Sequence, residues 1–157
     1  MDRDILSKAK NIAFRLLKYR IRSEKELSSR LKIRKIPFEI ISKVIRDLKE
    51  LSLINDREFA RVWVRESLRK GLGPLRIRMQ LRQKGIEESL ITNFLDNPEA
   101  DQGYATIIEG LIKKRLSRYK DKDKLKIKRK LTLYLRSRGF SFKHIQQALE
   151  GYSYDNG

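Results

Sequence analysis

Three short segments of the sequence share one pattern: an apolar residue, a cationic stretch and a second apolar residue. They read LKIRKI at 31–36, LRQKGI at 81–86 and LRSRGF at 135–140. A shift of fifty residues without a gap carries the first segment onto the second, and a shift of fifty-four carries the second onto the third. Ungapped repetition at this period is typical of tandem repeats, whose stacked units bury faces that one unit alone leaves exposed. The sequence therefore predicts three repeats.

The spacing of apolar residues predicts that every repeat is helical. Apolar residues recur three and four positions apart, and alternating strand patterns with hairpin turns are missing. Ser23 with Glu26 and Asn55 with Glu58 read as capping boxes, and Asn97 and Ser141 read as further helix caps. We expect nine helices at about 4–20, 24–34, 37–51, 55–70, 74–84, up to 96, 97–119, 123–137 and 141–151.

Nine helices in three groups predict an all-α fold of three tandem three-helix repeats. We place the repeats at 1–54, 55–97 and 98–151, followed by a flexible tail at 152–157. Because each repeat would touch only its neighbours, we expect an elongated, curved molecule. One departure from the pattern is Lys35, which stands where the later segments have Gly85 and Gly139 and leaves the end of the helix before it less well defined.

Composition narrows the classes of function. The chain has 157 residues, is 39% hydrophobic and 37% charged, and carries a formal net charge of +18. Such a charge favours polyanions or an acidic protein surface and opposes self-association, so we expect nucleic-acid contact and a monomer. The absence of Cys, the acidic start MDRDIL and the lack of a long apolar run fit a cytoplasmic protein without membrane contact.

No enzyme signature is found in the sequence. Serine-hydrolase, zinc-protease, Walker A and dinucleotide-binding motifs are all missing, and His144 is the only histidine. We interpret His144 as a polar surface residue and Trp63 as a core residue. We therefore expect no catalytic activity, no cofactor and no metal.

The candidate binding residues are cationic, and their distribution is uneven. The three predicted repeats carry net charges of +8, +3 and +7, and the segment 113–130 has eleven basic and two acidic side chains. Such a run can lie along phosphates, although it can also be a solvated helix face. Tyr119 and Tyr134 could stack on exposed bases or pack in the core. The candidates are Arg76, Arg78, Arg82, Lys84, Lys113, Lys114, Arg115, Lys126, Lys128, Arg129 and Lys130.

Four segments together give the chain a resemblance to a known family. They are RSEKELSSRL at 22–31, LINDREFARVWV at 53–64, GPLRIRMQLRQKGI at 73–86 and LRSRGFSFKHIQQAL at 135–149. Their order and spacing resemble those of the RecX family, regulators of the RecA recombinase. The match extends from about Ala9 to Leu149, and the lysine-rich connection after Tyr119 is longer than is usual there.

The resemblance implies a non-catalytic protein that binds the RecA filament on single-stranded DNA along its helical groove. Binding of this kind implies restraint of the recombinase, ATPase and co-protease activities of RecA, and so a role in DNA repair, recombination and the SOS response. It does not decide whether RecA or DNA contacts dominate, whether double-stranded DNA also binds, or whether filament growth is capped or existing filament loosened. The alternative from the residues alone is a stand-alone DNA-binding protein of helix-turn-helix-like modules.

Overall fold

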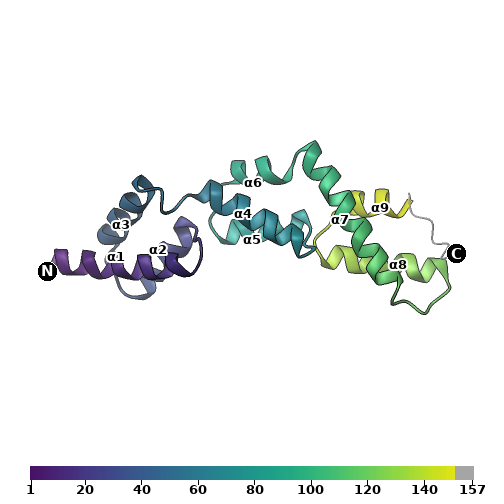
Figure 1. Ribbon diagram of the computed structural model, residues 1–157, viewed down its shortest axis with the longest axis horizontal. Coiled ribbons are helices and arrows are strands. Elements are labelled where there is room, and N and C mark those ends of the chain that lie inside the picture. Colours follow the sequence, from purple (N-terminus) through teal and green to yellow (C-terminus); the bar gives the residue numbers. More distant parts are fainter. Residues whose placement is uncertain (151–157) are drawn as a thin grey trace. The chain divides into compact units, whose positions relative to one another are not determined.

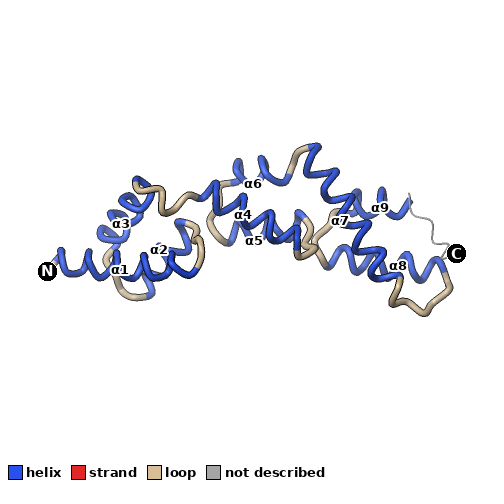
Figure 2. Tube along the Cα trace, in the orientation of Figure 1, coloured by secondary structure: helices blue, strands red, loops and turns tan. Residues whose placement is uncertain are grey.

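The computed structural model describes residues 1–150, which form α-helices joined by turns and contain no strand (Figures 1 and 2). The all-helical prediction is confirmed. The predicted tail at 152–157 and the predicted helix end at Gly151 lie outside the described residues. The helices are α1 (Asp2–Tyr19), α2 (Glu24–Ile33), α3 (Phe38–Glu50), α4 (Asp56–Arg69), α5 (Pro74–Gln83), α6 (Glu88–Leu95), α7 (Pro98–Leu116), α8 (Lys124–Ser137) and α9 (Phe142–Glu150).

Side-chain caps begin the helices at the residues that the sequence indicated. The backbone N–H of Glu26 donates to the Ser23 hydroxyl at 3.2 Å, and that of Ala100 donates to the Asn97 amide oxygen at 2.8 Å. Equivalent bonds reach Asn55 and Ser141 from the N–H groups three residues later, at 3.1 and 3.2 Å. Each cap satisfies one of the backbone donors that a helix N-terminus leaves free.

The three repeated segments end their helices in the same way. The backbone N–H groups of Ile36, Ile86 and Phe140 donate to the carbonyls five residues earlier, of Leu31, Leu81 and Leu135, at 3.2, 3.0 and 3.2 Å. The residue before each donor has a left-handed backbone, with φ of 59°, 76° and 97°. This is the Schellman arrangement, in which a left-handed residue lets two late N–H groups satisfy the last helical carbonyls. The alignment made on apolar residues is therefore confirmed in the backbone.

Crowding explains why glycine is present in only two of these segments. A Cβ atom built on Gly85 would lie 2.6 Å from the Cβ of Lys25, and one built on Gly139 would lie 2.5 Å from the Cβ of Arg76. Lys35 has no such neighbour to clash with: its side chain is exposed, and it adopts φ 59° only at the steric cost that a left-handed backbone imposes on a non-glycine residue. Glycine is therefore needed where another segment packs against the turn.

The described chain divides into two compact units, and each unit contains part of the middle predicted repeat. The first comprises residues 1–62 and 81–90, and the second comprises 63–80 and the described residues from 91 to 150. No helix in the described part is both long and apolar enough to cross a bilayer.

The core of the first unit lies where α1, α2 and α3 pack against one another. The Ser23 hydroxyl also donates to the carbonyl of Lys84 at 2.7 Å, and the backbone N–H of Glu24 donates to the Asp56 carboxylate at 2.9 Å. The first bond joins the start of α2 to the turn that follows α5, and the second joins it to the start of α4. The buried core residues are Ala9, Ile12, Ala13, Leu27, Leu31, Ile36, Ile41, Val44, Ile45, Leu48 and Ile54.

The second unit repeats this joint with a different set of donors. Its core lies where α7, α8 and α9 pack together. The backbone N–H of Gly73 donates to the carbonyl of Arg138 at 2.7 Å, and that of Leu75 donates to the carbonyl of Gly139 at 2.9 Å. The start of α5 is thus bonded to the turn that follows α8. The buried core residues are Tyr104, Ile108, Ile112, Leu116, Ile127, Leu131, Leu135, Phe140, Ile145 and Leu149.

We expect Gly139→Ala to destabilise the protein by about 2 to 4 kcal/mol, since the new methyl group would be strained at φ 97° and would overlap Arg76. The matched control is Gly110→Ala, at a position in α7 where a Cβ meets no atom within 4 Å. There alanine should stabilise the helix by about 1 kcal/mol. Urea denaturation measures both changes, and equal effects at the two sites would contradict the packing described for the turn.

Candidate interaction surface

The densest cationic segment, residues 113–130, comprises the end of α7, the connection and the start of α8 (Figure 1). The helix dipole acts differently on these charges at the end of α7 and at the start of α8. The last turn of α7 carries Lys113, Lys114 and Arg115, where the helix dipole favours positive charge. The first turn of α8 has no acidic residue, so its lysines oppose the dipole, and only the Asp123 cap, 3.0 Å from the N–H of Leu125, supports that terminus. The lysines in the first turn of α8 are thus placed against local helix stability.

Some of the predicted binding residues in this segment have partners inside the protein. Lys113 pairs with Glu109 at 3.3 Å, and Lys130 lies 3.7 Å from the Asp121 carboxylate. The guanidinium of Arg115 lies 3.9 Å from the centre of the Tyr134 ring, a cation–π contact.

Tyr119 and Tyr134 are partly buried and pack against the core of the second unit. Tyr119 also lies under the Lys130 ammonium, 5.5 Å from the ring centre. Of the two roles considered for these tyrosines, the structure shows core packing.

The remaining predicted residues of the segment are exposed and unpaired. They form no hydrogen bond or ion pair through their side chains with any described residue, and they lie on both helices: Lys114, Lys126, Lys128 and Arg129. An exposed cation without an internal partner is available to pair with an anionic group of a binding partner. We name these four residues the free cation set.

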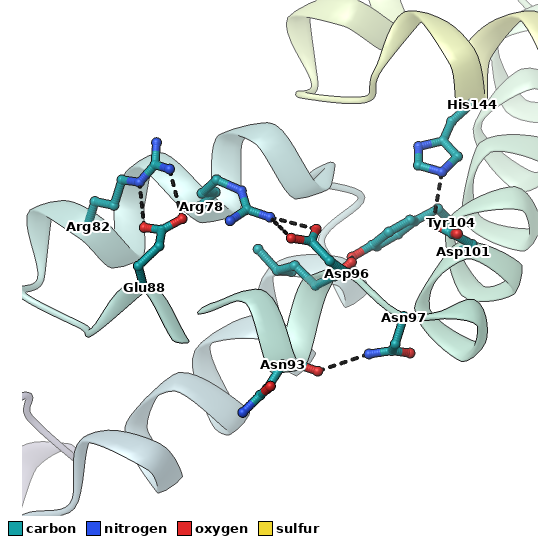
Figure 3. Close-up of polar contacts among 10 residues, drawn as sticks. Arg78, Arg82, Glu88, Asn93, Asp96, Asn97, Asp101, Tyr104 and His144 are labelled. Atoms are coloured by element: carbon teal, nitrogen blue, oxygen red, sulfur yellow. Dashed lines mark hydrogen bonds and ion pairs between the residues drawn. The ribbon is translucent and has the colours of Figure 1, made fainter. Parts of the chain in front are cut away.

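Two of the predicted cations on α5, Arg78 and Arg82, in contrast contact acidic residues of their own unit (Figure 3). In the second unit, Arg78 donates to both carboxylate oxygens of Asp96 at 2.6 and 2.5 Å. In the first unit, Arg82 makes a two-pronged contact with Glu88 at 2.9 and 2.8 Å, and these hydrogen bonds raise the pKa of the Arg82 guanidinium.

The other two predicted cations, Arg76 in the first turn of α5 and Lys84 just after its end, are also engaged. Arg76 donates to the Ser137 carbonyl at 3.3 Å, and Lys84 lies 3.2 Å from the Glu26 carboxylate. The sequence indicated Arg78 and Arg82 as binding candidates but could not show that Asp96 and Glu88 lie beside them. Most of the positive charge of α5 is therefore balanced within the fold.

His144 has a structural role that the sequence did not indicate. Its Nδ1 lies 2.8 Å from the Ser141 hydroxyl and its Nε2 lies 3.0 Å from the Asp101 carboxylate, which joins α9 to α7 (Figure 3). Its ring also packs edge-on against buried Tyr104, with centroids 5.3 Å apart. Our interpretation of His144 as a surface residue was wrong, because its side chain is only 17% exposed.

Tyr104 anchors the same contact to the core. Its hydroxyl donates to the Leu95 carbonyl at 2.7 Å, and burial raises the pKa of the phenol, with the charges of Asp96 and Asp101 adding to the effect. The hydroxyl therefore stays protonated and keeps this bond at any physiological pH.

Exposed apolar side chains on the second helix of each predicted repeat were missed from the sequence. Ile33 on α2, Met79 on α5 and Leu133 on α8 are 73%, 54% and 68% exposed. Met79 and Leu133 correspond under the shift of fifty-four, so the alignment could have indicated them. Apolar side chains beside cations are a usual feature of protein-binding surfaces.

Comparison with known proteins identifies the family to which these three-helix domains belong. Family models for the first, second and third three-helix domains of RecX match residues 9–48, 55–95 and 104–149. Regulatory protein RecX of Mycolicibacterium smegmatis is 33% identical over 85% of this chain and 73% of its own length. This chain belongs to the RecX family. The resemblance stated from the sequence is thereby confirmed.

Further RecX proteins show the extent of the similarity. Regulatory protein RecX of Bacillus velezensis is 33% identical over 98% of this chain, which spans 58% of that relative's length. The crystal structure of RecX from Lactobacillus salivarius is 29% identical and superimposes with a TM-score of 0.85, covering 94% of this chain and 96% of that one. The cations above are therefore presented on RecX three-helix domains.

We expect the two kinds of cation to differ in their effect on folding. Arg78→Gln should lower the free energy of unfolding by about 1 to 2 kcal/mol, since it breaks a charged hydrogen bond from a side chain that is only 17% exposed. Lys126→Gln should change it by less than about 0.5 kcal/mol. Thermal denaturation of both variants checks this, and a larger loss from Lys126→Gln would contradict the assignment of that residue to the free cation set.

Proposed function

We propose that this chain is a non-catalytic regulator of RecA that binds the RecA filament on single-stranded DNA along its groove. Binding there restrains strand exchange, ATP hydrolysis and the co-protease activity. The proposal is supported by membership of the RecX family, whose relatives carry the name Regulatory protein RecX. The proposed location is the cytoplasm. The proposed state is a monomer, because a net charge of +18 opposes self-association.

The observation that carries the proposal is the free cation set on α7 and α8. Its side chains are exposed and have no acceptor among the described residues, and Lys126 lies in the first turn of α8, where a positive charge opposes the helix dipole. A charge kept at such a cost indicates a role in binding, because local rules of stability are broken most often at functional sites. Phosphates of filament DNA and carboxylates on RecA are the two kinds of acceptor that suit Lys and Arg.

Repetition extends the contact over more than one domain. Each three-helix domain adds its own exposed apolar side chain and its own cations, so contacts that are weak singly add up along one chain. A regulator of this kind needs no catalytic group. It holds the filament in one state by binding that state more tightly than the others.

We expect a substoichiometric amount of the chain to lower ATP hydrolysis by RecA on single-stranded DNA, because each bound molecule restrains the filament around it. The charge-reversed triple variant Lys126→Glu, Lys128→Glu, Arg129→Glu should need at least about tenfold more protein for the same inhibition, since attraction becomes repulsion at three contacts. A steady-state ATPase assay measures both.

The control is the triple variant Arg3→Glu, Lys8→Glu, Lys43→Glu. It makes the same change in net charge at exposed residues of the first unit outside the predicted binding residues. It should inhibit nearly as well as the unchanged chain. The absence of inhibition by the unchanged chain at any ratio would refute the proposed function.

A second candidate is a stand-alone DNA-binding protein whose three-helix domains enter grooves as helix-turn-helix modules. The exposed cations of α8, the second helix of its domain, favour it. This candidate predicts tight binding to duplex DNA without RecA, with log K falling by about 0.9 per phosphate contact for each unit of log salt. Fluorescence anisotropy across a salt series measures the slope. A weak, nearly flat dependence would exclude this candidate.

A further inference from the structure

A cationic cleft lies in the first unit between the α1–α2 connection, α2 and the end of α5. Its volume is about 270 Å³. Five of its lining side chains are cationic and one is a carboxylate: Arg20, Arg22, Lys25, Arg30, Lys84 and Glu26. Only Lys84 belongs to the binding residues predicted from the sequence. We name this feature the cationic cleft.

One carboxylate in the cleft serves several cations. Glu26 accepts a hydrogen bond from Arg20 at 2.6 Å and lies 3.2 Å from Lys84 and 3.6 Å from Arg22. Burial acts to raise the pKa of Glu26, but the bond from Arg20 and the contact with Lys84 outweigh it, so the pKa is lowered. Glu26 is therefore ionised at neutral pH, and its single negative charge is already shared among three partners.

Two other cations of the cleft, Lys25 and Arg30, have no counterion among the described residues, and Arg22 has only a share of Glu26. The Nε of Arg22 is buried and has no hydrogen-bond partner among the described residues. Lys25 and Arg30 are exposed and form no side-chain hydrogen bond or ion pair within residues 1–150. Burial lowers the pKa of the Arg22 guanidinium, and the positive charge of Arg20 lowers it further. Cations held this close together favour the entry of an anion.

The matching joint of the second unit shows that the fold does not need these charges. Under the shift of fifty residues, Lys25 and Arg30 correspond to Leu75 and Gln80, which are uncharged. The cations found at that joint are engaged by backbone, because Arg138 donates to the carbonyls of Gly71 and Lys70 and Arg76 donates to that of Ser137. The cations of the second joint thus have hydrogen-bond partners, whereas Lys25 and Arg30 at the first joint have none among the described residues.

We propose that the cationic cleft binds a phosphate group, either a phosphodiester of a nucleic-acid strand or a free phosphate. Lys25 and Arg30 make the first contacts because their side chains are exposed, and Arg22 adds charge from its covered position. Guanidinium groups match phosphate oxygens in a two-pronged geometry, and the volume accommodates one such group. Ile33, which also lines the cleft and is 73% exposed, offers an apolar surface to an adjoining sugar or base. The isolated chain binds phosphate at this site, and RecA is not required.

The test follows the Arg22 Nε–H resonance in a nitrogen-15 NMR spectrum, since this group has no hydrogen-bond partner within residues 1–150. The chain is titrated at low salt with inorganic phosphate and, separately, with a short thymidine oligonucleotide. We expect a saturable shift of this resonance with at least one of them. The probe that saturates at the lower phosphate concentration identifies the source, and sodium chloride at equal ionic strength should give no saturable shift.

Two double variants of equal charge decide whether the effect is local. Lys25→Gln with Arg30→Gln should abolish the saturable shift and reduce the salt slope of oligonucleotide binding by about 1.4, since each single-strand contact contributes about 0.7. Lys43→Gln with Arg57→Gln, at exposed residues of the same unit that do not line the cleft, should retain both. Equal losses in the two variants, or no saturable shift with either probe, would overturn the proposal. A shift produced only by a glutamate-rich peptide would also overturn it.

Discussion

The left-handed turn at the end of each second helix is the constraint on which the rest of the structure depends. Its backbone closes the helix, and in two cases it also packs against the start of a helix about sixty residues away, where Gly85 meets Lys25 and Gly139 meets Arg76. A side chain at either glycine would separate the two segments. The same residue thus ends one helix and joins it to another, which is why a small change there acts on both local and tertiary structure.

Chemistry at the two joints differs although their geometry is shared. Ser23 donates through its hydroxyl in the first unit, whereas Gly73 donates through its backbone in the second. At the second joint, Arg138 donates hydrogen bonds to backbone carbonyls. At the first joint, the single carboxylate of Glu26 is instead shared among several cations. A repeat fixes where backbones meet and leaves the side chains around the meeting point free to acquire separate roles.

Net charge alone is a poor guide to where a basic protein binds. Arg78 and Arg82 are prominent in the sequence, yet Asp96 and Glu88 hold them within the fold. Cations such as Lys126 have no acceptor among the described residues. The number of cations in a segment therefore does not show how many of them are available to an external partner.

The sequence by itself determined the helices, their caps and the equivalence of the three turns, because apolar spacing and residues such as Ser141 act over one or two helical turns. It also indicated the RecX family and the cationic segment at 113–130. Only the tertiary structure decided that Lys84 joins Arg20 and Arg22 at Glu26 and that His144 bridges to Asp101, since Lys84 and Asp101 lie far from their partners in the sequence. Long-range pairing depends on how helices pack, and packing is set by the whole core rather than by any local pattern.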